Sequence, residues 1–223
     1  MAKLSALLFD MDGTLVDTDD VHFQAYQTVL EREGLGITRR YYDREMSGRP
    51  NPEILRGLLP SRPEHERNEL IEEKEARFRD GADHLRATPG LHDLLAWSEA
   101  EGVRRIVVTS APGVNADFML GGLELQNAFE DVVLAERLER GKPDPLPYQV
   151  GLERLGVAAE HALAFEDSLA GVRSASGAGI ETVAVATTQS PDDLRAAGAA
   201  LVITDFRDDA LWQRLRERLG SSA

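Results

Sequence analysis

The chain has 223 residues, a formal net charge of −14 at neutral pH, 42% hydrophobic residues and no cysteine. This length and apolar content exclude a disordered chain or a stapled miniprotein, and fit one medium domain or a core with a smaller second unit. The lack of cysteine excludes disulfides, thiolate catalysis and cysteine-ligated zinc. The acidic balance disfavours nucleic acid and anionic membranes, so a phosphorylated ligand requires locally concentrated positive charge.

The N-terminal residues contain one short apolar run that acidic residues interrupt. No later stretch approaches the roughly 20 apolar residues of a membrane-spanning helix. We therefore expect a cytoplasmic protein that binds neither membrane nor nucleic acid. The sequence leaves the oligomeric state open and is compatible with a monomer.

The first apolar run, at residues 6–9, is predicted to be a buried strand, and the next such run comes only at 106–108. This interval is too long for one crossover connection. It has helical patterns at 21–32, 38–46, 52–59 and 64–79, separated by glycine and proline. The charged run over 64–79 is too short for a coiled coil and is typical of a solvent-facing helix surface. We predict an inserted helical unit over residues 16–87.

Beyond the insert, short runs without polar alternation recur at 106–108, 132–135, 163–165, 182–186 and 201–203. Such runs are typical of buried parallel strands. Amphipathic segments at 92–101 and 148–155 precede Gly102 and Gly156, where helices commonly end. Alternating strands and helices predict an α/β fold with an open, doubly wound parallel sheet, formed by residues 1–15 and 88–223.

Polar side chains directly follow three of these predicted strands, where ligands bind in open α/β sheets. They are Asp10 and Asp12, Thr109 and Ser110, and Glu166 and Asp167. Lys142, in the loop GKPDP, is one of three lysines in a chain whose other basic side chains are arginines. A lysine between glycine and proline favours a site that requires a compact point charge.

This combination predicts phosphoryl transfer through a covalent aspartyl phosphate. Oxygen ligands from Asp10, the Asp12 carbonyl and Asp167 suit Mg²⁺, which would neutralise the phosphate. Lys142 and the Thr109 hydroxyl would hold other phosphate oxygens. Asp12 would then be available as general acid for the leaving oxygen and as general base for water.

Each feature also has a structural alternative. The paired aspartates before Gly13 are compatible with an Asx turn. Thr109 and Ser110, or the acidic pair before Ser168, could cap the helices that follow them. A single lysine is most often a surface charge. The occurrence of all four features in order, each at a predicted strand end or in the lysine loop, favours the catalytic interpretation.

The four segments DMDGT, VVTS, GKPDP and FEDS resemble, in order, the four motifs of the haloacid dehalogenase superfamily of phosphohydrolases, and the match spans nearly the whole chain. The resemblance implies a Rossmann-like core with a mobile helical cap inserted after the first strand, Mg²⁺ dependence and Asp10 as the phosphoacceptor. It places Glu166 with the metal ligands and Ser110 beside the substrate. Asp12 argues against the dehalogenases, and Lys74 shows no context for the Schiff-base lysine of the phosphonate-cleaving members.

Within the insert, the residues resemble the β-phosphoglucomutase-like subgroup. In DTDDVHFQAY, the spacing of Thr18 and His22 from Asp10 resembles the hinge and cap entrance of that subgroup, although His22 could be an ordinary partly buried histidine. In MSGRPNPE, Gly48 and Arg49 resemble a substrate-facing cap loop, against the alternative of a surface arginine. The mutases carry arginine three residues after that glycine, where this chain has Asn51, which favours a phosphatase.

We therefore expect a Mg²⁺-dependent phosphomonoesterase that acts on a small phosphorylated metabolite, such as a sugar or polyol phosphate. Hinges near Val16 and Thr88 would let the cap open and close. Two alternatives remain, a sugar-phosphate mutase that excludes water and a receiver-like phosphoacceptor module. A receiver-like module, however, is far shorter and needs no inserted cap. The sequence does not specify the metabolite or the pathway.

Overall fold

The computed structural model describes residues 2–47, 49–81, 85–187 and 189–220. It divides into two compact units. One comprises Met1–Asp17 and Arg86–Ala223 and is called the sheet unit here; the other, Thr18–Leu85, is called the helical unit.

The sheet unit contains six parallel strands in the order β5-β4-β1-β6-β7-β8. They are β1 (Ala6–Phe9), β4 (Arg104–Thr109), β5 (Val132–Leu134), β6 (Ala162–Glu166), β7 (Glu181–Val185) and β8 (Leu201–Ile203). The chain adds β4 and β5 on one side of β1 and the remaining strands on the other. This reversal beside β1 is the position where open α/β sheets bind ligands. Each of the six predicted runs overlaps one of these strands.

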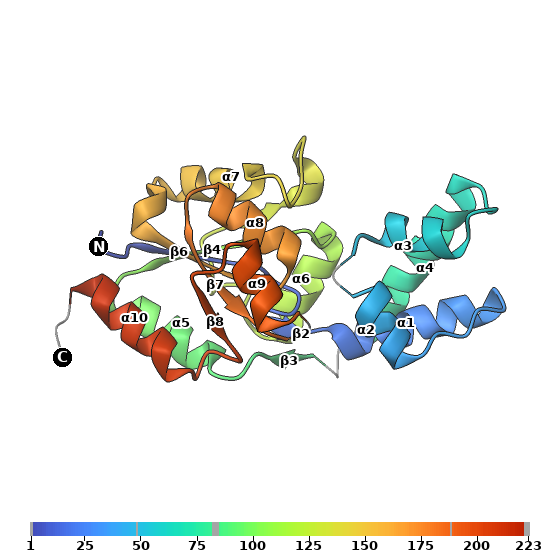
Figure 1. The fold of residues 1–223 in the computed structure, drawn as a ribbon, viewed down its shortest axis with the longest axis horizontal. Helices are drawn as coiled ribbons and strands as arrows, with labels where there is room; N and C mark the ends of the chain where they lie inside the picture. Colours follow the sequence, from blue (N-terminus) through green and yellow to red (C-terminus); the bar gives the residue numbers. More distant parts are fainter. Residues whose placement is uncertain (1, 48, 82–84, 188, 221–223) are drawn as a thin grey trace. The chain divides into compact units, whose positions relative to one another are not determined.

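Helices cover both faces of this sheet (Figure 1). The helices are α5 (Leu91–Ala100), α6 (Gly113–Gly122), α7 (Leu146–Leu155), α8 (Leu169–Gly177), α9 (Pro191–Ala197) and α10 (Asp209–Leu219). On one face, Leu8 of β1 belongs to a buried cluster with residues of α7 and α8. On the other, Phe9 stacks on Phe165 at 4.9 Å and meets Phe206 edge to face. This alternation is the period of two expected of a strand buried on both sides.

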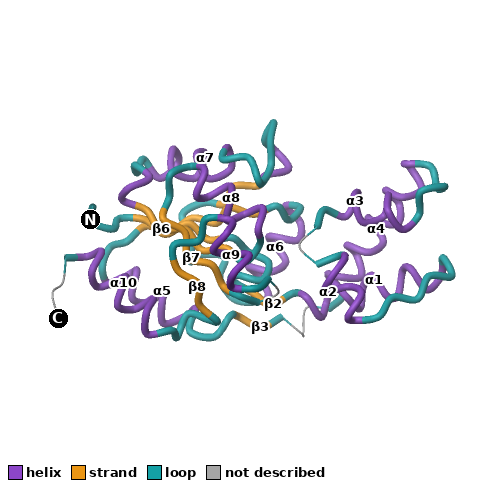
Figure 2. The backbone as a smooth tube through the Cα atoms, in the orientation of Figure 1, coloured by secondary structure: helices purple, strands orange, loops and turns teal. Residues whose placement is uncertain are grey.

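The helical unit has α-helices and connecting segments but no strand among its described residues (Figure 2). Its helices are α1 (Asp19–Arg32), α2 (Arg39–Glu45), α3 (Asn51–Leu58) and α4 (Glu64–Arg79). They overlap the four helices predicted for the insert. Apolar side chains from α1 to α3, including Tyr26, Tyr42 and Leu55, form its core. Among the described residues, no helix is both long and apolar enough to span a membrane.

A second, two-stranded sheet pairs β2 (Val16–Asp17) with β3 (Arg86–Ala87) in antiparallel register. These strands were not predicted, since two residues are too few to show a periodic pattern. Beside them, the Thr88 hydroxyl donates to the Thr14 carbonyl at 2.6 Å, and the Thr88 N–H donates to the Leu15 carbonyl at 2.9 Å. The two segments that lead to and from the helical unit are thus hydrogen-bonded to each other.

Candidate active site

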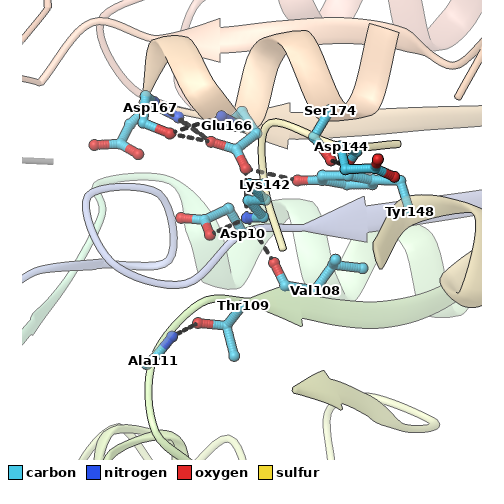
Figure 3. Close-up of polar contacts among 12 residues, drawn as sticks. Asp10, Val108, Thr109, Ala111, Lys142, Asp144, Tyr148, Glu166, Asp167 and Ser174 are labelled. Carbon is cyan, nitrogen blue, oxygen red and sulfur yellow. Dashed lines mark hydrogen bonds and ion pairs between the residues drawn. The ribbon is translucent and has the colours of Figure 1, made fainter. Parts of the chain in front are cut away.

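The residues predicted to share a site come from the carboxyl ends of neighbouring strands (Figure 3). Asp10 directly follows β1, and its N–H donates to the Phe165 carbonyl of β6 at 2.9 Å. Glu166 is the last residue of β6, and Thr109 is the last of β4. Because β1 lies between β4 and β6, these ends lie side by side at the reversal point of the sheet.

The Lys142 ammonium connects these strand ends. It donates to Asp10 Oδ1 at 2.5 Å, to Glu166 Oε1 at 2.5 Å and to the Val108 carbonyl at 2.9 Å. An ammonium has three protons, so each one has an acceptor here. The Lys142 side chain is only 5% exposed. The predicted local positive charge is therefore present, and it is held against the carboxylate of Asp10.

Glu166 is fully buried, and both of its carboxylate oxygens accept hydrogen bonds. Oε1 accepts from Lys142 and from the Tyr148 hydroxyl, the latter at 2.9 Å. Oε2 accepts from the N–H groups of Asp167 and Ser168 and from the Ser168 hydroxyl. These N–H groups lie at the amino end of α8, where a negative charge is favoured by the helix dipole. Glu166 thus serves as a fixed counter-ion for Lys142.

The electrostatics of the site follow from burial and from the charge triad formed by Asp10, Lys142 and Glu166. Burial, followed by the Glu166 charge, raises the pKa of Asp10 from 3.8 to about 7, although Lys142 acts in the opposite direction. Burial disfavours the Lys142 ammonium, but the charges of Asp10 and Glu166 outweigh it and raise the Lys142 pKa. Two carboxylates that share one cation repel each other, so the site attracts further positive charge.

That further positive charge can come from a metal ion, for which three carboxylates offer ligands. Asp10, Glu166 and Asp167 each offer one oxygen, and these oxygens lie within 4.8 Å of one another. Asp167 can approach the loop after β1 because Gly13 has no side chain. A Cβ on Gly13 would lie 2.1 Å from Asp167 Oδ2, and the φ of Gly13 is +75°. An all-oxygen donor set of this kind suits a hard divalent cation.

The hydroxyl residues of the second motif have different exposures. Thr109 is buried, and its Oγ1 accepts from the Ala111 N–H at 2.9 Å, whereas Ser110 is exposed. Asp12 is half-buried in the turn after Asp10, where it forms a bridge to Val16. Thr109 thus lies at the carboxyl end of β4, and Asp12 lies in the turn that follows β1.

The candidate residues of the helical unit have contacts of their own. Thr18 is buried just before α1, and His22 Nδ1 lies 2.8 Å from the Lys74 ammonium. Asn51 donates from Nδ2 to Glu75 Oε1 at 2.6 Å and accepts at Oδ1 from Tyr26.

Arg49 is exposed, and one of its N–H groups donates to the Glu45 carbonyl at 3.0 Å. Gly48, predicted to bind substrate, lies outside the described residues.

Two buried residues near these candidates were missed by the sequence argument. Tyr148 reaches Glu166 from the first turn of α7, and Lys74 is 2% exposed and donates to Glu75. Tyr148 lies six positions after Lys142 at the start of a predicted helix, but an aromatic residue there is equally typical of a core position. Lys74 lies in a strongly charged run whose residues resemble a solvated surface.

A model of the haloacid dehalogenase-like hydrolases matches residues 7–185. The chain belongs to this family. The prediction of family and enzyme class made from the motifs is therefore confirmed.

Relatives of this hydrolase include two named phosphatases. The phosphorylated carbohydrates phosphatase of Thermotoga maritima is 35% identical over 185 residues, covering 81% of this chain and 84% of that protein. The fructose-1-phosphate phosphatase of Escherichia coli is 28% identical, covering 82% and 97%. Among solved structures, the β-phosphoglucomutase of Clostridium difficile has a TM-score of 0.82 at 22% identity, and the match covers 97% of each chain. That likeness concerns the fold alone, and it confirms the predicted Rossmann-like sheet with flanking helices.

Proposed function

We propose that this hydrolase is a Mg²⁺-dependent phosphomonoesterase for a small phosphorylated metabolite, such as a sugar or polyol phosphate. The observation that carries the proposal is the Lys142 ammonium held between Asp10 and Glu166, beside a group of three carboxylates, Asp10, Glu166 and Asp167, whose oxygens lie within 4.8 Å of one another. A phosphate ester and a carboxylate nucleophile repel each other, so the site must supply positive charge at the point of attack. The substrate class follows the two named phosphatases, both of which act on phosphorylated carbohydrates by name.

The carboxylates fit Mg²⁺ because all the donors are oxygens and because the group carries excess negative charge. Asp10, Asp167 and the Asp12 carbonyl would hold the ion, and Glu166 is the third carboxylate of the acidic group. When bound, the ion would supply charge neutralisation at the phosphoryl oxygens.

The protein's own residues would then act in two steps. In the first, an Asp10 oxygen attacks phosphorus, the bond from phosphorus to the ester oxygen breaks, and Asp12 donates a proton to the departing alcohol. In the second, water attacks the same phosphorus and gives its proton to Asp12. The bond from phosphorus to Asp10 breaks and inorganic phosphate leaves. The Thr109 hydroxyl, and Lys142 after it exchanges its hydrogen bond to Asp10 for one to phosphate, would hold the remaining phosphoryl oxygens in both steps.

The helical unit is proposed to choose the substrate, through Thr18, His22, Gly48, Arg49 and Asn51, with Ser110 contributing from the sheet unit. The proposed boundaries of the inserted cap remain residues 16–87, with hinges near Val16 and Thr88. Charge at Arg49 suits an anionic or polyhydroxyl substrate.

The test is phosphate release from a panel of sugar, polyol and short-chain phosphates with Mg²⁺ or with EDTA. We expect release only with metal, and none from the Asp10→Asn protein. Each mixture is also analysed for isomerised substrate, since isomerisation without release would identify a mutase. A stable phosphoprotein that does not turn over would identify a signalling module. Metal-independent release, or activity retained in Asp10→Asn, would contradict the mechanism.

A further inference from the structure

Tyr148 occupies a core position that packing alone does not explain. It is fully buried and belongs to the apolar cluster under β1 and β4. Its hydroxyl nevertheless donates to Glu166 Oε1 at 2.9 Å, and the Lys142 ammonium lies 5.3 Å from the centre of its ring. A buried hydroxyl is costly without a partner. Phenylalanine would fill the same space, so the hydroxyl itself requires an explanation.

The hydroxyl acts on the charge triad through one shared atom. Glu166 Oε1 accepts from both Tyr148 and Lys142, and the ammonium uses its two other protons on Asp10 and the Val108 carbonyl. A displacement of Oε1 therefore changes the direction of the Lys142 hydrogen bonds. The chain of contacts runs from Tyr148 through Glu166 and Lys142 to Asp10.

The other sides of the Glu166 carboxylate are fixed by backbone. Oε2 accepts from N–H groups at the start of α8. A Cβ on Gly171 would lie 1.9 Å from Glu166 Cδ, so the carboxylate rests directly on the helix backbone. The Ser168 hydroxyl also donates to Oε2, so the side chains of Tyr148 and Lys142 set where Oε1 lies.

We propose that Tyr148 is a positioning residue, which aligns the Lys142 ammonium on Asp10 by holding Glu166 Oε1. The kinetic part of this inference rests on the proposed function; the contact itself does not. Tyr148 does not reach the reacting atoms, so its effect should appear in turnover more than in substrate binding.

The first experiment compares Tyr148→Phe with wild type on the best substrate of the panel. We expect kcat to fall by about tenfold, as is typical when a residue behind a site residue is removed, while KM changes by less than about twofold. Tyr42→Phe is the matched control. Tyr42 is also buried, and its hydroxyl donates to a carboxylate, Asp19 Oδ1, at 3.2 Å. Tyr42→Phe is expected to keep the wild-type kcat even if its Tm falls.

The second experiment repeats Tyr148→Phe in a Glu166→Gln background. If Tyr148 acts through the Glu166 carboxylate, its effect on kcat should shrink to less than about twofold there. An equal loss in both backgrounds, or an unchanged kcat in Tyr148→Phe alone, would overturn the proposal.

A third measurement needs no substrate. The chain has three lysines, Lys3, Lys74 and Lys142, so the Lys142 ammonium can be followed by NMR in metal-free protein labelled with ¹⁵N-lysine, and assigned with a Lys142→Arg sample. We expect Tyr148→Phe to shift or broaden this signal and to leave the Lys74 signal unchanged. An unaltered Lys142 signal would reject the positioning role. Should wild type release no phosphate from any ester, the proposed function fails, and this signal still decides the role of Tyr148.

Discussion

Asp10, the proposed nucleophile, lies where burial and a neighbouring carboxylate disfavour its charged form. Burial and the Glu166 charge raise its pKa from 3.8 to about 7. Between these values the folded state binds the proton and the unfolded state does not, so the free energy of unfolding falls as pH rises from about 4 to 7. Asparagine at this position has no charge to desolvate.

We therefore predict that Asp10→Asn gains stability relative to wild type as pH rises. In EDTA, the difference in unfolding free energy should move in favour of the variant by roughly 2–4 kcal/mol between pH 5 and pH 8. Urea titrations followed by circular dichroism at the two pH values measure it. A difference that stays constant with pH would show that Asp10 is not desolvated.

Lys142 has the opposite role, because it compensates two buried carboxylates. Lys142→Met would leave Asp10 and Glu166 facing each other without a cation, and we expect a loss of about 3 kcal/mol or more in unfolding free energy at pH 7.5. Lys3→Met is the control, since Lys3 is exposed and should change stability by less than about 0.5 kcal/mol. Similar stabilities of the two variants would refute this account of the triad.

At the scale of an element, α8 shows how a helix can be adapted to a site. Gly171 lies within α8 without a positive φ, so alanine would normally stabilise the helix by up to about 1 kcal/mol. The carboxylate of Glu166 occupies the space that the alanine methyl group needs. Glycine at this position lowers the intrinsic helix propensity of α8, but it lets the Glu166 carboxylate approach the helix backbone.

We predict that Gly171→Ala is destabilising by about 1–3 kcal/mol and lowers turnover, because the methyl group displaces Glu166. Gly57→Ala is the matched control. Gly57 lies in α3, and a Cβ there would meet nothing within 4 Å, so the substitution should be neutral or slightly stabilising. Thermal unfolding and kcat of both variants provide the comparison. A stable, active Gly171→Ala protein would contradict the packing argument.

Elements differ in how well the sequence predicts them. The six strands of the large sheet are short apolar runs buried on both faces, and such runs are recognisable without structure. The pair β2 and β3 is too short to show a pattern. No bounds were predicted for helices α6, α8, α9 and α10, although α10 begins at a clear cap, in which Asp208 accepts from the Ala210 N–H.

Site residues likewise differ in how well the sequence predicts them. Asp10, Thr109, Glu166 and Lys142 could be grouped from sequence because parallel strands end at one edge and the lysine stands in a distinctive loop. The partners of Asn51 could not be predicted, since Tyr26 and Glu75 lie 25 and 24 residues away along the chain. Contacts between helices depend on packing that no local pattern specifies.

At the scale of the whole molecule, Arg218 joins distant parts of the sheet unit. It is 3% exposed, donates to the carbonyls of Ala2 and Glu160, and pairs with Glu181. Glu181 is the first residue of β7, so these contacts lie at the amino ends of the strands, opposite Asp10.

We predict that Arg218→Met lowers the unfolding free energy by about 2–4 kcal/mol, because it leaves buried acceptors unpaired. Turnover should change by less than about twofold. Arg216→Met, at an exposed position of the same helix, should alter neither quantity. Denaturant titration with parallel kinetics tests this, and a loss of kcat without a loss of stability would contradict it.

The pairing of β2 with β3 also bears on how such enzymes diversify. Asp17 and Arg86 are partners in that ladder, so the chain leaves and re-enters the sheet unit at neighbouring points. Opposed residues of an antiparallel ladder are only about 5 Å apart, a gap that a two-residue hairpin closes. The intervening 68 residues, Thr18–Leu85, therefore behave as a cassette. Under the proposed function, exchanging or resizing that cassette would change substrate choice without a change in the six-stranded framework.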